Sequence, residues 1–304
     1  MQGGRRAEEQ GRENQFLWPM LQTLPYFRAL LRAVEADFYE EFDLTAPMLD
    51  LGCGDGQFAS QVFRKQIDVG VDPALGSLRE AKRDGELESL RAQKTRTRWS
   101  CYSAAPSNAT SMGAGENAAY KDLVQAFGSK IPFPDGYFAS GFSNSVLEHI
   151  QDLQPVINET ARVMKKGALF LFCVPNHRWQ ENLAISGLLK RIGLKGWANA
   201  YVRLFTRISR HVNMLSPEEW KTKLDKAGFD LNHYWHYFPP AALHALEWGH
   251  YFGLPSWVAR ALTGRWILAP GRWNLALTER AIRKYAEGGE DQDGTYTWYV
   301  ARKR

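Results

Sequence analysis

The stretch Met48-Leu-Asp-Leu-Gly-Cys-Gly-Asp-Gly-Gln-Phe-Ala59 decides the fold. Its first four residues form a short, mainly apolar run, which predicts a buried strand. Gly52, Gly54 and Gly56 follow at every second position and predict a tight turn into a helix that begins near Gln57. Because glycines have no side chains, a ligand can lie against the backbone of this turn, and the helix offers it N-terminal amides.

A second apolar segment, residues 68–73, includes Asp72 at its predicted end, sixteen residues after Gly56. Residues 75–90 predict a further helix. Strand, helix and strand in this order form the βαβ unit of a parallel sheet. A carboxylate at the end of the second strand can accept hydrogen bonds from both hydroxyls of a ribose. The two segments together predict a nucleoside site at the carboxyl edge of the sheet.

The rest of the chain extends this pattern. We expect a helix over 147–164, closed by Lys165, Lys166 and Gly167, and another over 217–228 that begins at the cap Ser216. Further strands are expected at 122–126, 137–143, 168–174, 229–237 and 295–302. The fold class predicted is α/β, a doubly wound, mostly parallel seven-stranded sheet whose last strand is antiparallel.

The expected organisation is one domain over residues 15–304 behind a disordered tail, residues 1–14. The additions to the sheet are N-terminal helices within 15–44, an exposed insertion at 91–119, and cap or substrate-recognition insertions at 177–215 and 239–290.

Composition narrows the class of protein. The chain has 304 residues, 44% hydrophobic and 23% charged, which is ordinary globular usage. Three cysteines are too few for a disulfide framework, and the run from His233 to His236 lacks the cysteines or paired carboxylates of a metal site. No apolar run approaches the ~18 residues of a membrane span. We therefore expect a cytoplasmic protein without a metal.

The identity of the nucleoside turns on Asp55. Residues 54–59 also fit the dinucleotide pattern G-x-G-x-x-A, so an NAD-dependent oxidoreductase is an alternative. A carboxylate inside the loop opposes a pyrophosphate, whereas Asp50 and Asp55 suit a ligand that carries an ammonium and a sulfonium.

Four segments in this order resemble the motifs of the class I S-adenosylmethionine-dependent methyltransferases, in particular their small-molecule branch. MLDLGCGDGQFA resembles the glycine-rich first motif, VGVDPA the ribose-binding second motif, SKIPFPDGYFASGFSNSVLEHI the fourth strand, and ARVMKKGALFLFCVPN the helix and fifth strand. The resemblance covers roughly residues 45–176 and resumes at SPEEWKTKLDKAGF. It implies a Rossmann-like fold and S-adenosyl-L-methionine as the cofactor.

The resemblance also implies a set of cofactor-binding residues. The glycines pass beneath the methionine and ribose, Asp72 holds the ribose, and the segment after the third strand contacts the adenine. The full set is Asp50, Gly52, Gly54, Asp55, Gly56, Asp72, Pro73, Gly128, Ser129 and Asn144. Phe127 stands where the family usually has an acidic residue that receives the adenine amino group. A degenerate member that binds a nucleoside without turnover is therefore a second alternative.

Catalysis depends on the acceptor. Methyl transfer from a sulfonium is an in-line displacement, in which alignment supplies much of the rate. A general base is needed only where the nucleophile carries a proton of high pKa. The candidates are His149 and His177, at the ends of the fourth and fifth strands.

The second half of the chain points to the acceptor. Residues 178–212 carry a net charge of +6, and eight of the 11 tryptophans lie between Trp179 and Trp273. Aromatic area beside basic residues suits a small-molecule or lipid-like acceptor, with peripheral membrane contact. The competing account is a helical cap with buried indoles. Ser143-Asn-Ser-Val146 differs from the Asn-Pro-Pro-Tyr loop of nucleic acid base methyltransferases, which argues against nucleic acid.

Overall fold

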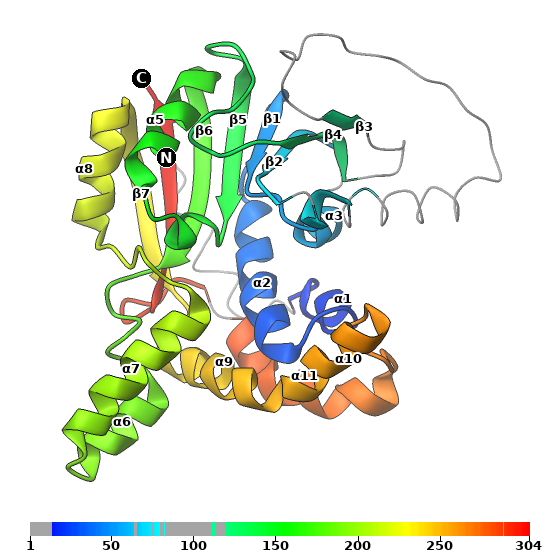
Figure 1. Ribbon diagram of the computed structural model, residues 1–304, viewed down its shortest axis with the longest axis vertical. Helices are drawn as coiled ribbons and strands as arrows, with labels where there is room; N and C mark the ends of the chain where they lie inside the picture. The colour runs from blue at the N-terminus through cyan, green and yellow to red at the C-terminus, as the bar shows by residue number, and fades with distance from the viewer. Residues whose placement is uncertain are drawn as a thin grey trace, which may run out of the picture. The chain divides into compact units, whose positions relative to one another are not determined.

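The computed structural model describes residues 14–63, 66–74, 76–79, 82, 111–113, 119–287 and 289–304 (Figure 1). The chain divides into two compact units. Unit 1 comprises Met1–Phe42, Pro175–Leu215 and Trp235–Trp298, and unit 2 comprises Asp43–Val174, Ser216–Tyr234 and Tyr299–Arg304, as far as these ranges are described. That residues 15–304 form a single domain stays a prediction.

The sheet has the strand order β3-β4-β2-β1-β5-β6-β8-β7. Its strands are β1 (Met48–Leu51), β2 (Ile67–Asp72), β3 (Ser111–Gly113), β4 (Tyr120–Gln125), β5 (Phe138–Asn144), β6 (Met164–Pro175), β7 (Phe229–Tyr237) and β8 (Tyr296–Lys303). Strand β1 runs parallel to β2 and β5, β2 to β4, and β5 to β6. The doubly wound, mostly parallel sheet is therefore confirmed. The short strand β3, antiparallel to β4, makes eight strands instead of seven.

This topology fixes where a ligand binds. The chain leaves β1 for β2 on one side and later enters β5 on the other. In open α/β sheets the crevice lies at such a reversal, beyond the carboxyl ends of the strands. All four residues of β1 are buried, as expected for a strand covered on both faces.

Helices α3 (Gln57–Val62), α5 (Leu153–Val163) and α8 (Pro217–Ala227) of unit 2 flank these strands. The start of α8 confirms the sequence prediction. The Ser216 Oγ accepts the Glu219 amide at 3.3 Å, and the Glu219 carboxylate accepts the Ser216 amide at 2.8 Å. This capping box satisfies two backbone donors that the helix leaves without partners.

The predicted helix over 147–164 was wrong at both ends. A short 3-10 turn, η1 (Leu147–His149), precedes α5, which ends at Val163. Lys165–Gly167 belong to β6 instead of closing the helix. Met164 is already extended (φ −90°, ψ 140°) and pairs with Phe138 of β5. Basic residues before a glycine are typical of a helix end, but here they lie within β6, at an irregularity between the pairs Phe138–Met164 and Ser140–Leu169.

Unit 1 is helical outside its strand segments. Its helices are α1 (Leu17–Leu21), α2 (Tyr26–Tyr39), α6 (Ala184–Arg191), α7 (Lys195–Ser209), α9 (Pro240–Phe252), α10 (Leu254–Thr263) and α11 (Arg272–Ala286). Helix α2 packs against α1, α9 and α11. Helices thus occupy the expected ranges 15–44, 177–215 and 239–290.

The expected N-terminal tail is one residue too long. Asn14 is buried, and its Oδ1 accepts the amides of Phe16 and Leu17 while its Nδ2 donates to the carbonyls of Ala33 and Ala286. The rest of the tail lies outside the described residues.

Two other predicted segments are described only in part. Residues 76–79 and 82 of the predicted helix 75–90 are helical. Of the insertion 91–119, only β3 and residue 119 fall within the described ranges. Among the helices that the structure describes, none combines the length and the apolar character needed to cross a bilayer.

Candidate functional site

The glycine-rich loop after β1 has the backbone that its sequence demands. Gly52, Gly54 and Gly56 have φ angles of +82°, +55° and +70°, where a side chain is disfavoured. The amide of Gly52 donates to the carbonyl of Val71 in β2 at 2.8 Å, and Gly56 begins α3. The loop is thereby fixed between two parallel strands and a helix.

The glycines serve different purposes. A Cβ on Gly52 would lie 2.4 Å from the Val146 Cγ1, so this glycine allows close packing inside the protein. A Cβ on Gly54 would meet no described atom within 4 Å. The open backbone at Gly54 is the part of the loop against which a ligand can lie.

Asp72 at the end of β2 faces this loop. One carboxylate oxygen accepts the Gly54 amide at 3.1 Å and the other accepts the Ala74 amide at 2.7 Å. Burial raises the pKa of Asp72, and the two amide hydrogen bonds partly oppose that rise. A carboxylate has about four lone-pair sites, so Asp72 retains acceptors for two ribose hydroxyls.

Carboxylates dominate the electrostatics of the loop. Burial raises the pKa of the Cys53 thiol, and the negative charges of Asp50, Asp72 and Asp55 raise it further. Asp50 is buried and accepts a hydrogen bond from the Tyr120 hydroxyl of β4 at 2.6 Å. Its negative charge therefore acts on the loop from inside the protein. This field favours a positively charged ligand over a pyrophosphate. Asp55 also accepts the Gln57 amide at 3.3 Å and so helps to start α3.

The segment expected to contact the adenine follows β4. A Cβ on Gly128 would lie 3.0 Å from the Val156 Cγ1, so Gly128 is a packing glycine. Ser129 is exposed, and the Phe127 side chain is 73% exposed. Pro73, which follows β2, is also exposed. These surface positions can contact a base, and Phe127 can offer a ring face for stacking.

Asn144 ends β5 and is buried. Its Oδ1 accepts the Cys173 thiol at 3.2 Å, which joins it to β6. The neighbouring Ser143 hydroxyl donates to the Leu51 carbonyl at 2.9 Å. Both side chains tie the carboxyl end of β5 to an adjacent strand.

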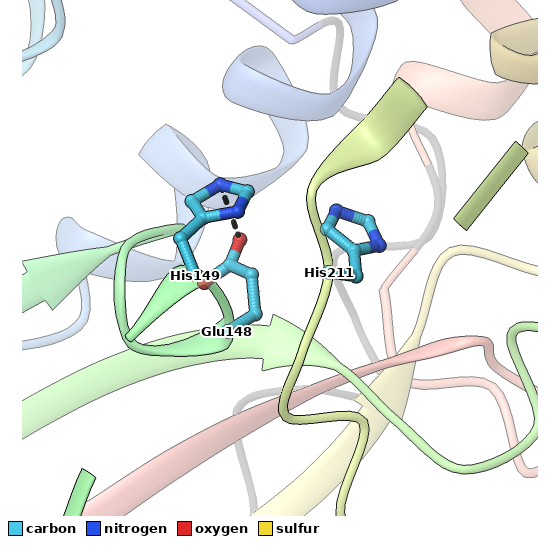
Figure 2. Close-up of side chains that lie close together, drawn as sticks. All are labelled: Glu148, His149 and His211. Carbon is cyan, nitrogen blue, oxygen red and sulfur yellow. Dashed lines mark ion pairs between the residues drawn. The ribbon is translucent and has the colours of Figure 1, made fainter. Parts of the chain in front are cut away.

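His149 lies in the turn η1 just beyond this end. Its Nε2 is 3.7 Å from the Glu148 carboxylate, as the dashed line in Figure 2 marks. The Glu148 side chain is buried and the His149 side chain is half-exposed. Sequence reasoning missed Glu148, although the adjacent acid and histidine in Val146-Leu-Glu-His-Ile150 were a visible signal. His211, also drawn there, belongs to unit 1, where it lies edge-on to Trp179.

The structure sorts the predicted site residues between the units. All ten predicted cofactor residues and His149 belong to unit 2. His177 belongs to unit 1 and is exposed in a turn after β6. The histidines predicted at one sheet edge are therefore parts of different units.

Comparisons with known proteins agree with this geometry. Residues 22–234 match the family model described as "Methyltransferase domain". Among curated proteins, none matches the chain. A possible histamine N-methyltransferase from Thermotoga maritima is similar in structure, with a TM-score of 0.51, 12% identity and coverage of 91% of both chains. Geranyl diphosphate C-methyltransferase from Streptomyces coelicolor has a TM-score of 0.49 and 16% identity over 92% of this chain and 82% of that one.

Proposed function

The chain belongs to the methyltransferase domain family, as an S-adenosylmethionine-dependent enzyme, and from this premise we propose that it methylates a small-molecule, lipid-like acceptor. The observation that carries the proposal for the cofactor is the pairing of the Gly54 amide with Asp72 beside an open backbone. These residues fit the cofactor. A Cβ at Gly54 would occupy the open space beside the loop backbone, and the Asp72 carboxylate can accept hydrogen bonds from the ribose hydroxyls.

We assign the remaining cofactor roles to unit 2. Gly52 and Gly56 shape the loop, and Asp50 and Asp55 provide its negative field. Pro73 follows the ribose carboxylate, Gly128 and Ser129 adjoin the base, and Asn144 supports the methyl-donor end. Stacking on Phe127 compensates for the absent acidic residue there.

The bound cofactor supplies an activated methyl group, and the chain supplies alignment. Where the acceptor carries a proton, we propose that His149 removes it while the buried Glu148 carboxylate orients the imidazole. His177 remains a second candidate for this role.

Acceptor recognition is assigned to residues 177–215 and 239–274 of unit 1. Among the described residues, 18 large hydrophobic side chains are exposed, and 16 of them belong to unit 1. Such a concentration of apolar surface marks a binding region. It favours an apolar acceptor.

Calorimetric titration with S-adenosylhomocysteine and with NAD tests the cofactor. We expect binding of the former only, because the loop carboxylates oppose a pyrophosphate. Micromolar affinity for NAD would favour the oxidoreductase alternative. Turnover with isoprenoid, fatty acyl and compact polar acceptors then tests the acceptor class, and methylation of the polar acceptors alone would contradict a lipid-like substrate. Absence of turnover despite tight S-adenosylhomocysteine binding would favour the non-catalytic alternative.

A further inference from the structure

Helices α6 and α7 pack against each other as a hairpin (Figure 1). At its tip, all eight residues of Lys190-Arg-Ile-Gly-Leu-Lys-Gly-Trp197 are exposed. Ile192, Leu194 and Trp197 expose large apolar side chains there, and the Trp197 side chain is 70% exposed. Three cations lie among these apolar residues. The tip therefore combines apolar bulk with positive charge.

The outer side of α7 continues this arrangement. Trp197, Leu204 and Ile208 are exposed and recur at a spacing of seven and four residues, so they form one row along the helix. Arg203 and Arg207 are exposed in a second row, about 100° around the axis. The third side carries the buried residues Ala198 and Phe205, which face the protein.

An apolar row beside a basic row is typical of a helix that lies in a membrane interface. Such a helix buries its apolar row at the boundary of headgroups and acyl chains, while its arginines reach the phosphates. Tryptophan is favoured at that depth, because its ring is largely apolar and its N–H finds a polar partner.

The hairpin is held firmly within unit 1. The buried Glu247 of α9 accepts the amides of Ala184 and Ile185 at 2.5 and 3.2 Å, at the start of α6. It also accepts the Tyr201 hydroxyl of α7 at 2.6 Å. The base of the hairpin is thus fixed, while its tip and outer row remain uncovered by the described part of the chain.

The positive charge of the hairpin indicates which kind of partner binds this surface. Residues 184–212 contain six lysines and arginines and no aspartate or glutamate. A symmetric contact between two copies would place these cations against each other, which opposes self-association. Anionic lipid neutralises them instead, with each nearby cation strengthening binding about fivefold.

We propose that the α6–α7 hairpin docks on an anionic membrane surface, with Ile192, Leu194 and Trp197 entering the interface. This surface lies outside the residues assigned to the cofactor. Its membrane contact does not depend on methyl transfer, so the two proposals fail in separate experiments.

Sedimentation with vesicles of phosphatidylcholine, alone or mixed with phosphatidylserine, tests the proposal. We expect the full-length protein to sediment with the anionic vesicles, and Ile192→Ser combined with Trp197→Ser to weaken binding at least tenfold. The matched control is Leu277→Ser in α11, which removes an apolar side chain that is 82% exposed elsewhere in unit 1 and should leave binding within about twofold. Equal losses in both variants, or no sedimentation of the unaltered protein, would overturn the proposal.

A charge variant separates the electrostatic contribution. Arg203→Gln with Arg207→Gln should lower affinity for the anionic vesicles about twentyfold and leave the weak binding to neutral vesicles unchanged. S-adenosylhomocysteine affinity, measured by calorimetry, should be the same in all these variants, and circular dichroism with thermal unfolding reports that they are folded. If sedimentation velocity instead shows a dimer that the tip variant dissociates, without vesicle binding, the surface is a contact between copies and the proposal is wrong.

Discussion

Unit 2 and unit 1 differ in how they treat large apolar side chains. Among the described residues, unit 2 exposes only Phe127 and Tyr234, whereas unit 1 exposes sixteen. None of the ten residues of α10, all described, is buried. Unit 2 buries most of its large apolar side chains between the sheet and its helices. Unit 1 leaves more apolar surface exposed, which is the arrangement expected of a recognition region.

The tryptophans of the second half of the chain also divide into buried and exposed side chains. Trp179 is buried, as a packed helical cap requires, and Trp220 of α8 and Trp235 of β7 are buried outside the cap segments. Trp197 and Trp273 are exposed, together with Trp248 and Trp257, which the packed-cap account does not explain. The second half of the chain therefore contains both structural indoles and indoles available for binding, and the predictions below separate the two.

The largest effect on stability is expected at a buried indole. Trp179→Ala removes a side chain that stacks on Phe205 with 5.5 Å between ring centroids, and should lower the free energy of unfolding by about 4 kcal/mol. Trp273→Ala should change it by less than about 0.5 kcal/mol. Urea unfolding followed by circular dichroism measures both. Similar values for the two variants would remove the division between structural and binding indoles.

The second prediction compares substitutions at two glycines of the loop, Gly52 and Gly54. Gly52→Ala should lower the free energy of unfolding by about 3 kcal/mol, since its Cβ meets Val146 and its φ is positive. Gly54→Ala has only the backbone cost, about 1 kcal/mol, because its surroundings are open. Gly54→Ala should instead weaken S-adenosylhomocysteine binding, as measured by calorimetry. Unchanged binding would mean that the cofactor does not lie against Gly54.

The third prediction concerns Asp72. Asp72→Ala should weaken S-adenosylhomocysteine binding by about 2 kcal/mol, because two hydrogen bonds to a charged acceptor are lost. The matched control is Asp135→Ala, also in unit 2, whose carboxylate is exposed and pairs with Arg162 at 2.6 Å. It should leave the affinity unchanged. An unaltered affinity in folded Asp72→Ala would refute the ribose role.

The pH dependence of binding follows from Asp72. Burial raises its pKa above the ordinary value of 3.8, and ribose binding uses the carboxylate. Affinity should therefore fall as the pH falls through this raised pKa, earlier than for an exposed aspartate. Titrations at several pH values test this, and Asp72→Asn should flatten the profile. If Asp72→Asn showed the same pH dependence of affinity as the unaltered protein, the titrating group would not be Asp72.

The smallest effect is expected at His250 in unit 1. Burial lowers the pKa of His250, whose ring is tilted against Phe27 with 4.4 Å between ring centroids, and the Arg28 charge lowers it further. Its neutral form is favoured in the folded state, so stability is lost as the pH falls below about 6.5 towards the lowered pKa. Unfolding measured across this range should show less acid loss in His250→Phe. An identical slope would exclude His250 as the cause.

The sequence by itself determined the sheet and the cofactor loop. Glycines at alternate positions after an apolar run permit few backbones, and an aspartate at the end of the next parallel strand must come to the same edge. The turn at Gly52, Gly54 and Gly56 and the place of Asp72 beside it were therefore predictable from local order along the chain, and their contact with the cofactor stays a prediction. The cap of α8 at Ser216 was equally local, since its partner is three residues away.

Only the tertiary structure decided the rest, because the deciding contacts come from distant parts of the chain. Met164 pairs with Phe138 and Leu169 with Ser140, which places Lys165–Gly167 inside β6 at an irregularity of the register, against their local preference. A Cβ on Gly52 would meet Val146, whereas a Cβ on Gly54 would meet no described atom within 4 Å. The alternate spacing of the glycines in the sequence does not reveal this difference. Likewise, the charge of residues 178–212 predicted a membrane contact, but only the packing of α6, α7 and Glu247 shows which side chains remain exposed to make it. Burial is a property of what covers a residue, and that is set by elements far from it in sequence.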